Sequence, residues 1–180
     1  MIASTIFWAA GAIASLASAS SCPGGDFIPN AESQTIVAAS YIDMWNGRFS
    51  LENRTFAPDV VLYQDRLPGL NGSIELPVAS SAEFIAFMRL ARFGWHHYKF
   101  VVRALAFEGY NLVIRWALNA TVGPRDKMLI PINKPEGTHI TFNGTDWLYL
   151  DKCTFKIKQV DSAQDYIREL YLEGITEIKI

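Results

Sequence analysis

The feature that most constrains the fold is a pair of alternating apolar and polar runs between Gly137 and Asp161. A short polar corner at Asp151-Lys152 separates the two runs. Alternation with a period of two is typical of strands with one buried face, so the stretch predicts an antiparallel hairpin. The same alternation places Asp161 at the end of an apolar row that starts at Phe155, just before a helical pattern over residues 162–171. An acid at the end of an apolar strand face calls for a functional explanation.

The rest of the chain carries further helix and strand patterns. Apolar residues at helical spacing predict helices over residues 36–45, 50–56 and 82–93, with Ser50 and Ser81 as the expected N-caps. Strands are predicted over 60–65, 96–107 and 111–121, the last two joined by a hairpin loop at Glu108-Gly109-Tyr110. This order indicates an α+β fold in which helices cover one face of a mostly antiparallel sheet. A strongly curved sheet closed by N-terminal helices would leave a cone-shaped pocket.

Composition narrows the class of function. The 180 residues are 50% hydrophobic and 13% aromatic, which suffices for one domain with a well-buried core. The formal charge of −2 gives no basic footprint for nucleic acid. No cluster has metal-ligand spacing, and neither a glycine-rich phosphate loop nor a nucleophile elbow is present in the sequence. We therefore expect a reaction without cofactor or metal, or no reaction.

The N-terminus has the pattern of a signal peptide over residues 1–19. Ile2 to Ala19 is apolar and small, and Ala17-Ser18-Ala19 is a small-x-small cleavage site, although the usual basic region is missing. A retained membrane anchor is the alternative, but the segment is short and weakly hydrophobic for a span. We expect cleavage after Ala19, an arm over residues 20–32 and no membrane span in the mature protein.

Two further features favour the secretory pathway. Four Asn-x-Ser/Thr sequons predict N-glycosylation at Asn53, Asn71, Asn119 and Asn143. The two cysteines, Cys22 and Cys153, are expected to pair and to pin the N-terminal arm to the sheet in an oxidising compartment. Two separate buried thiols are the alternative.

Several motifs in order resemble the SnoaL-like branch of the NTF2-like superfamily, which includes polyketide cyclases, ketosteroid isomerases and scytalone dehydratases. They are Phe56-Ala57-Pro58-Asp59-Val60-Val61-Leu62, the helix around Glu83-Phe84-Ile85, Glu108-Gly109 before Leu112-Val113-Ile114-Arg115-Trp116, and Phe142-Asn143-Gly144 before Asp161. The resemblance covers residues 33–172, with a tail over 173–180. It implies a cone-shaped curved sheet closed by N-terminal helices, and it is much less specific for a reaction.

The resemblance also implies candidate catalytic residues. Asp161 matches the acid/base carboxylate at the end of the last strand of SnoaL-like cyclases, although an Asp there could equally cap the following helix. Alignment with scytalone dehydratase favours His97 as the catalytic histidine, whereas strand periodicity places His96 on the apolar face. The Tyr and protonated Asp of ketosteroid isomerase would have candidates in Tyr63 and Asp65.

These residues leave two functions open. The first is a cyclase, isomerase or dehydratase that acts on a hydrophobic small molecule, a polyketide or terpenoid intermediate of secondary metabolism. The second is a non-catalytic lipophile-binding protein. Either would use an aromatic-lined pocket, and the expected lining residues are Tyr41, Trp45, Tyr63, Trp95, His96, Trp116 and Trp147. A homodimer through the outer face of the sheet is a further expectation, which a glycan on Asn119 would oppose.

Overall fold

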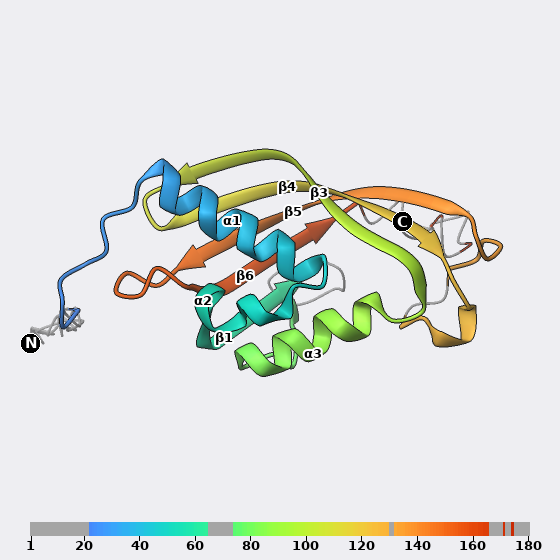
Figure 1. Ribbon diagram of the computed structural model, residues 1–180, viewed down its shortest axis with the longest axis horizontal. Coiled ribbons are helices and arrows are strands. Elements are labelled where there is room, and N and C mark those ends of the chain that lie inside the picture. The colour runs from blue at the N-terminus through green and yellow to red at the C-terminus, as the bar shows by residue number, and fades with distance from the viewer. Residues whose placement is uncertain (1–21, 65–73, 130–131, 166–170, 172–173, 175–180) are drawn as a thin grey trace, which may run out of the picture.

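The fold is a six-stranded curved sheet with its helices grouped at one side (Figure 1). The structure is a computed structural model that describes residues 22–64, 74–129, 132–165, 171 and 174. The elements, in chain order, are α1 (Ala31–Trp45), the 3₁₀ turn η1 (Phe49–Leu51), α2 (Glu52–Thr55), β1 (Phe56–Gln64), β2 (Ile74–Glu75), α3 (Ser81–Arg92), β3 (Trp95–Glu108), β4 (Asn111–Val122), the 3₁₀ turn η2 (Arg125–Lys127), β5 (His139–Leu150) and β6 (Ile157–Gln164).

The sheet has the strand order β2-β1-β6-β5-β4-β3. All neighbouring strands are antiparallel except β1 and β6, which are parallel. The predicted α+β class and both predicted long hairpins, β3–β4 and β5–β6, are confirmed. The inner face of β4 supplies much of the core, because alternate residues from Leu112 to Val122 are almost fully buried.

The helices begin at caps that the sequence signals only in part. Asn30 caps α1 and forms a capping box with Ser33. Ser80 caps α3, one residue before the predicted Ser81. Ser50 lies inside η1 and does not cap α2, so that prediction was wrong. The α1 helix packs against β3 and β4, and α3 packs against β1, which closes one face of the sheet.

Two β-bulges decide which side chains face the core. In β6, Leu150 pairs with Ile157 and Tyr149 pairs with Gln159, so Lys158 is an extra residue. In β3, Trp95 pairs with Val122 and His97 pairs with Thr121, which makes His96 the extra residue. An extra residue shifts a strand by one position and turns every following side chain to the other face.

The C-terminal segment differs from its prediction. The expected helix over residues 162–171 does not begin at Ser162, because β6 continues to Gln164 and pairs with β5 up to Gly144. The ladder therefore satisfies the backbone groups that a helix start would have left open. Residues 166–170, 172 and 173 lie outside the described part of the chain.

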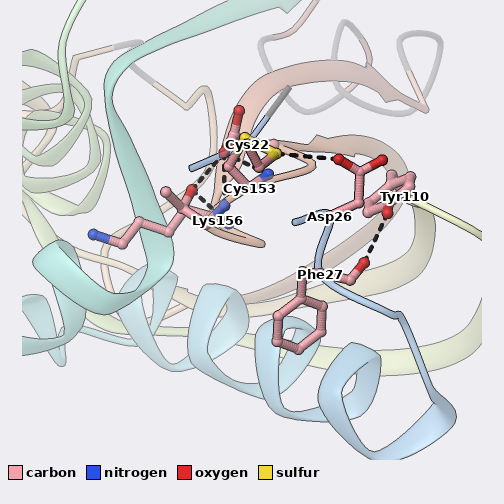
Figure 2. Close-up of a disulfide and its surroundings, with 8 residues drawn as sticks. Cys22, Asp26, Phe27, Tyr110, Cys153 and Lys156 are labelled. Carbon is pink, nitrogen blue, oxygen red and sulfur yellow. Dashed lines mark hydrogen bonds between the residues drawn. A yellow bond between two sulfur atoms is a disulfide. The ribbon is translucent and has the colours of Figure 1, made fainter. Parts of the chain in front are cut away.

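The expected disulfide between Cys22 and Cys153 is confirmed (Figure 2). The bond ties the N-terminal arm to the turn between β5 and β6. The backbone N–H of Phe27 donates to the carbonyl of Lys152, and the Tyr110 hydroxyl donates to the carbonyl of Phe27. The Phe27 ring stacks on Phe155 with the ring centroids 4.3 Å apart. The arm is thus held by covalent, polar and aromatic contacts.

Candidate functional site

A cavity of about 90 Å³ lies between the inner face of the sheet and the helices. Its wall is mostly aromatic and aliphatic, as in sites for small apolar ligands. The lining residues are Trp45, Gln64, Phe87, Ala91, Trp95, Tyr98, Phe100, Trp116, Leu118, Leu129, Ile132, Phe142, Asp146, Ser162 and Gln164. Among them Asp146 is the acidic residue, and it is 2% exposed.

The polar part of the wall comes from three adjacent strands. Gln64 of β1 pairs with Ser162 of β6, and Ser162 pairs with Asp146 of β5. Side chains at paired positions point to the same face of a sheet, so these three form a polar row across the inner face. Gln164 continues the polar wall two residues beyond Ser162. The cavity therefore has one polar side and an otherwise apolar lining.

Both oxygens of the Asp146 carboxyl accept hydrogen bonds. The Tyr41 hydroxyl, from α1, donates to Oδ2 at 2.9 Å, and the Ser162 hydroxyl donates to Oδ1 at 2.7 Å. Burial raises the pKa of Asp146 to about 6, against the opposing effect of the Ser162 hydroxyl, the nearby Trp116 indole and the Tyr41 hydroxyl. A carboxyl with that pKa exchanges its proton readily near neutral pH.

The neighbouring Tyr41 is held in its protonated form. Burial and the adjacent Asp146 carboxylate raise its pKa well above the ordinary value, while the Trp45 indole opposes them. Tyr41 therefore acts as a fixed donor that orients the Asp146 carboxyl.

Two indole rings flank this pair. Trp45, at the end of α1, packs among aromatic rings that include Phe100, with ring centroids 5.1 Å apart. Trp116 of β4 lies over Gly144 of β5, where an added Cβ would stand 2.1 Å from Cζ2 of the indole. Glycine at 144 is thus required for Trp116 to cross the strand toward Asp146.

Asp161 does not line this cavity. It pairs with Trp147 and Tyr63 on the outer face of the sheet, and it accepts a hydrogen bond from Gln159 at 2.9 Å. The expectation that it ends the pocket-facing row was wrong, because the bulge at Lys158 turns it to the other face. Ser162 takes the inward position instead.

Neither histidine faces the cavity. His96 is the bulged residue of β3, and its Nε2 atom lies 2.6 Å from Oε1 of Glu136 at the surface. His97 pairs with Thr121 on the outer face and is exposed. The bulge places Trp95 and Tyr98 on the inner face, so the inward placement of either histidine was wrong.

The other expected site residues divide evenly. Trp45 and Trp116 line the cavity. Tyr41 is hydrogen-bonded to Asp146, which is itself a lining residue. Tyr63 and Trp147 lie on the outer face, where Trp147 is 46% exposed, and His96 is at the surface. Asp65 lies outside the described residues, and so does the sequon at Asn71. The predicted sequons at Asn53, Asn119 and Asn143 fall on described residues, of which Asn53 is exposed and the other two are half-buried on the outer face.

Sequence reasoning missed Asp146 and Ser162. The signal for Asp146 was present, because it shares strand parity with Ile140, Phe142, Gly144, Leu148 and Leu150. It is one acid within an otherwise apolar row. The inward direction of Ser162 could be predicted only if the position of the bulge in β6 were known.

Two features of the described part of the chain complete the account of the site. Among the described residues, no group of three or more His, Cys, Asp and Glu side chains could hold a metal ion. Within the same part of the chain, no helix combines the length and apolar character needed to cross a membrane.

The chain resembles solved structures in fold but at low sequence identity. No family model and no curated protein matches it. A provisionally assigned SnoaL-like polyketide cyclase from Jannaschia sp. CCS1 matches with a TM-score of 0.63 and 16% identity, over 86% of this chain and all of the other. A protein from Catenulispora acidiphila with a ketosteroid isomerase-like fold, solved with trimethylamine, matches with a TM-score of 0.56 and 10% identity, over 77% of this chain and 92% of the other. The chain therefore shares its fold with these SnoaL-like and ketosteroid isomerase-like structures.

Proposed function

We propose that the protein is a cofactor-independent acid/base catalyst, a cyclase, isomerase or dehydratase, acting on a hydrophobic small molecule with Asp146 as the proton-transferring group. One observation carries the proposal: a buried carboxyl with a pKa of about 6 faces a cavity lined with aromatic side chains. Perturbed carboxyls in apolar clefts are typical of catalytic acids and bases. The provisional assignment of the Jannaschia protein as a SnoaL-like polyketide cyclase supports this reaction class.

In this mechanism the substrate lies with its apolar body against the aromatic wall and its reacting atoms against Asp146. The ionised carboxyl removes a proton from the substrate and then returns it, at the same or another atom, so no oxidant or metal is consumed. Tyr41 and Ser162 hold the carboxyl in place through their hydroxyl groups. Their donation also stabilises the ionised form, which burial alone would disfavour.

A matched pair of variants tests the proposal. Asp146→Asn keeps the shape of the side chain but cannot exchange a proton, so turnover should fall by about 10²–10⁴-fold. Asp161→Asn changes the carboxyl on the outer face of the same hairpin and should keep full turnover. Ligands extracted from the purified protein and identified by mass spectrometry serve as substrates. Equal conversion by wild type and Asp146→Asn would contradict the proposal.

The alternative is a non-catalytic lipophile-binding protein. It is favoured by one observation, that both oxygens of Asp146 already accept hydrogen bonds from the protein. In that case Asp146, Tyr41 and Ser162 form a structural network between α1 and the sheet. Wild-type protein would then not convert the extracted ligand. Asp146→Asn would change the stability of the protein but would still bind the same ligand.

We further propose that the protein acts in the secretory pathway. The disulfide between Cys22 and Cys153 supports this location, because such bonds persist in oxidising compartments. The predicted signal peptide lies outside the described residues. N-terminal sequencing of the protein from its host cells should find a start at Ser20, and an enzyme that removes N-glycans should lower its apparent mass. An uncleaved start and an unchanged mass would contradict this location.

A further inference from the structure

We propose that the indole N–H groups of Trp45 and Trp116 bind a neutral oxygen acceptor of the ligand, so that the cavity selects carbonyl compounds over hydrocarbons of the same shape. The inference rests on the proposed function only in taking this cavity as the ligand site. It assigns to two residues a recognition role that is separate from the proton transfer at Asp146.

Both indole nitrogens are buried without a hydrogen-bond partner. Trp45 is 7% exposed and Trp116 is 3% exposed, so solvent outside the protein does not satisfy them. A buried donor without an acceptor is rare in folded proteins and destabilising. Because an indole N–H can only donate, the missing partner must be an acceptor. Two such donors on the wall of one cavity indicate that its ligand supplies the acceptor.

The two donors come from different elements, and both residues line the cavity. The Trp45 indole, at the end of α1, lies close enough to the Tyr41 hydroxyl to lower the pKa of that group. The Trp116 indole, on β4, does the same to the Asp146 carboxyl. Tyr41 and Asp146 are themselves hydrogen-bonded at 2.9 Å, so both indoles lie beside the same buried pair.

Packing fixes both rings at this point. The Trp116 indole fits because residue 144 has no side chain, and the Trp45 indole is packed by Phe84, Phe87 and Phe100. Aromatic contacts alone would have been satisfied by Phe at either position. The indole N–H is the part of each side chain that the packing does not explain.

The charge of the surroundings selects a neutral acceptor. Asp146 is ionised at neutral pH, and a carboxylate on the ligand would be repelled by it in a medium of low dielectric constant. A hydroxyl or amine could donate to Asp146, but the two indole N–H groups can only donate and therefore need an acceptor, which a carbonyl oxygen supplies through its lone pairs. We therefore assign the site to a ketone, aldehyde, ester or quinone oxygen on an apolar body.

Two probes of equal shape test the inference. Acetophenone carries a carbonyl oxygen where α-methylstyrene carries a CH₂ group, and one aromatic ring suits a cavity of about 90 Å³. In wild-type protein with ¹⁵N-labelled tryptophan, acetophenone should shift two indole N–H signals and α-methylstyrene should shift neither by a comparable amount. Trp45→Phe and Trp116→Phe assign the two signals. The shifts themselves are measured in the wild-type protein, and the two variants serve only to assign the signals.

The ratio of the two dissociation constants provides the second readout. Each of Trp45→Phe and Trp116→Phe should reduce the preference for acetophenone by about tenfold, because one hydrogen bond is lost and the ring is kept. Trp95→Phe is the matched control, since Trp95 lines the same cavity from β3 but is not one of the two buried, unpartnered donors. It should weaken both probes equally.

The outcomes separate this inference from the proposed function. Equal binding of the two probes, no binding of either, or an unchanged ratio in both variants would overturn it. Asp146→Asn should retain the preference for acetophenone while losing turnover. If wild type binds the two probes equally and Asp146→Asn loses turnover, only the present inference is wrong. If wild type prefers acetophenone and Asp146→Asn keeps turnover, only the proposed function is wrong.

Discussion

At the scale of single residues, two opposing effects determine the pKa of the Asp146 carboxyl. Burial favours the neutral carboxyl, whereas the donors Ser162 and Tyr41 and the nearby Trp116 indole favour the ionised form. Burial is the larger effect, and the resulting pKa of about 6 lies above the ordinary 3.8. The donors keep the shift small enough for the carboxyl to ionise at neutral pH. Asp146 can therefore both accept and return a proton.

The raised pKa predicts how stability depends on pH. Well below pH 3.8 the carboxyl is protonated in both states and its burial carries no penalty. Between pH 4 and pH 6 the unfolded chain ionises before the folded one, so the free energy of unfolding falls as pH rises. The total loss is about 3 kcal/mol, the difference between a pKa of 3.8 and one of about 6. Urea unfolding of wild type and Asp146→Asn between pH 4 and pH 7.5 measures it.

Only the difference between the two proteins isolates Asp146, because other carboxyls titrate in the same range. Relative to wild type, Asp146→Asn should gain about 3 kcal/mol between pH 4 and pH 7, since the amide has no charge to bury. Asp161→Asn serves as the control on the outer face. Parallel curves for wild type and Asp146→Asn would contradict the raised pKa.

Gly144 provides a second prediction at this scale. Its replacement by Ala places a Cβ 2.1 Å from Cζ2 of Trp116, so the indole must move. We expect Gly144→Ala to destabilise the protein by about 1–3 kcal/mol, the usual cost of overpacking a core. In a Trp116→Leu background the same change should cost much less, because the ring is absent. A double-mutant cycle by thermal unfolding measures the coupling, and additive effects would contradict the proposed contact.

At the scale of elements, the two bulges explain what the sequence could and could not predict. The hydrophobic periods of the strands and helices predicted both long hairpins and the order of the longer elements, but they missed β2 and placed a helix where β6 continues. A bulge leaves no mark in that periodicity, because the strand remains alternating on either side of the extra residue. The unmarked shift at Lys158 moved Asp161 outward and Ser162 inward. The shift at His96 likewise replaced a histidine with Trp95 on the inner face.

The candidate site was therefore predicted only where it did not depend on the bulges. Trp45 lies on a helix, and Trp116 lies on β4, which pairs with β5 without a register shift. Both were expected in the lining. Asp146 lies in the regular part of β5, so its inward direction followed from alternation with Gly144 and Leu148. The candidate acid was nevertheless placed at Asp161, because that residue ends an apolar strand. Asp146, a single acid within an apolar row, was the better predictor of a pocket-facing carboxyl.

The junction of α1 and β3 gives a prediction for one contact between elements. The Asn46 side chain donates from Nδ2 to the carbonyl of Phe100 at 3.1 Å and accepts from the Phe100 N–H at 2.7 Å. The Asn46 side chain thus satisfies the two backbone groups of Phe100 that have no neighbouring strand, because β3 is an edge strand. Asn46→Ala should destabilise the protein by about 1–3 kcal/mol, because both backbone groups lose their partner. It should also weaken ligand binding, since Phe100 and Trp45 line the cavity.

Two measurements check this prediction, chemical unfolding and titration with acetophenone. Asn46→Asp is a matched control that keeps the acceptor for the Phe100 N–H and removes only the donor. Its loss of stability should be smaller than that of Asn46→Ala. An Asn46→Ala variant as stable as wild type would show that β3 does not depend on the helix at this point.

The N-terminal arm gives a prediction for a whole element. The disulfide joins residues 131 positions apart, and removing a long cross-link typically costs about 2–5 kcal/mol. We expect the double variant Cys22→Ser, Cys153→Ser to lose stability in that range and still fold, because the Phe27–Phe155 stack and the Phe27–Lys152 hydrogen bond remain. None of these arm residues lines the cavity, so acetophenone affinity should not change. A large loss of affinity would contradict this separation of arm and cavity.

At the scale of the whole molecule, the outer face of the sheet has two distinct regions. Trp147 is 46% exposed and stacks on Tyr149, with Val113 paired beside it on β4. Asn119 and Asn143, both predicted to carry glycans, lie on the same face, because Asn119 pairs with Thr141 and Asn143 pairs with Ala117. They are diagonal neighbours on adjacent strands. One region thus suits contact with another apolar surface, and the other would hold two large polar glycans.

This arrangement predicts that glycosylation decides the oligomeric state. Without glycans, the exposed Trp147 region can pair with the same region of a second copy about a two-fold axis, as homodimers usually do. Two glycans beside it would keep a flat partner away, because a sheet-on-sheet contact needs a separation of only about 10 Å. We expect protein from a host that does not glycosylate to be a dimer at micromolar concentration, and the glycosylated protein to be a monomer. Light scattering measures both, and Trp147→Lys in the unglycosylated protein should restore the monomer. A glycosylated dimer, or an unglycosylated dimer that Trp147→Lys leaves intact, would show that pairing does not use this face.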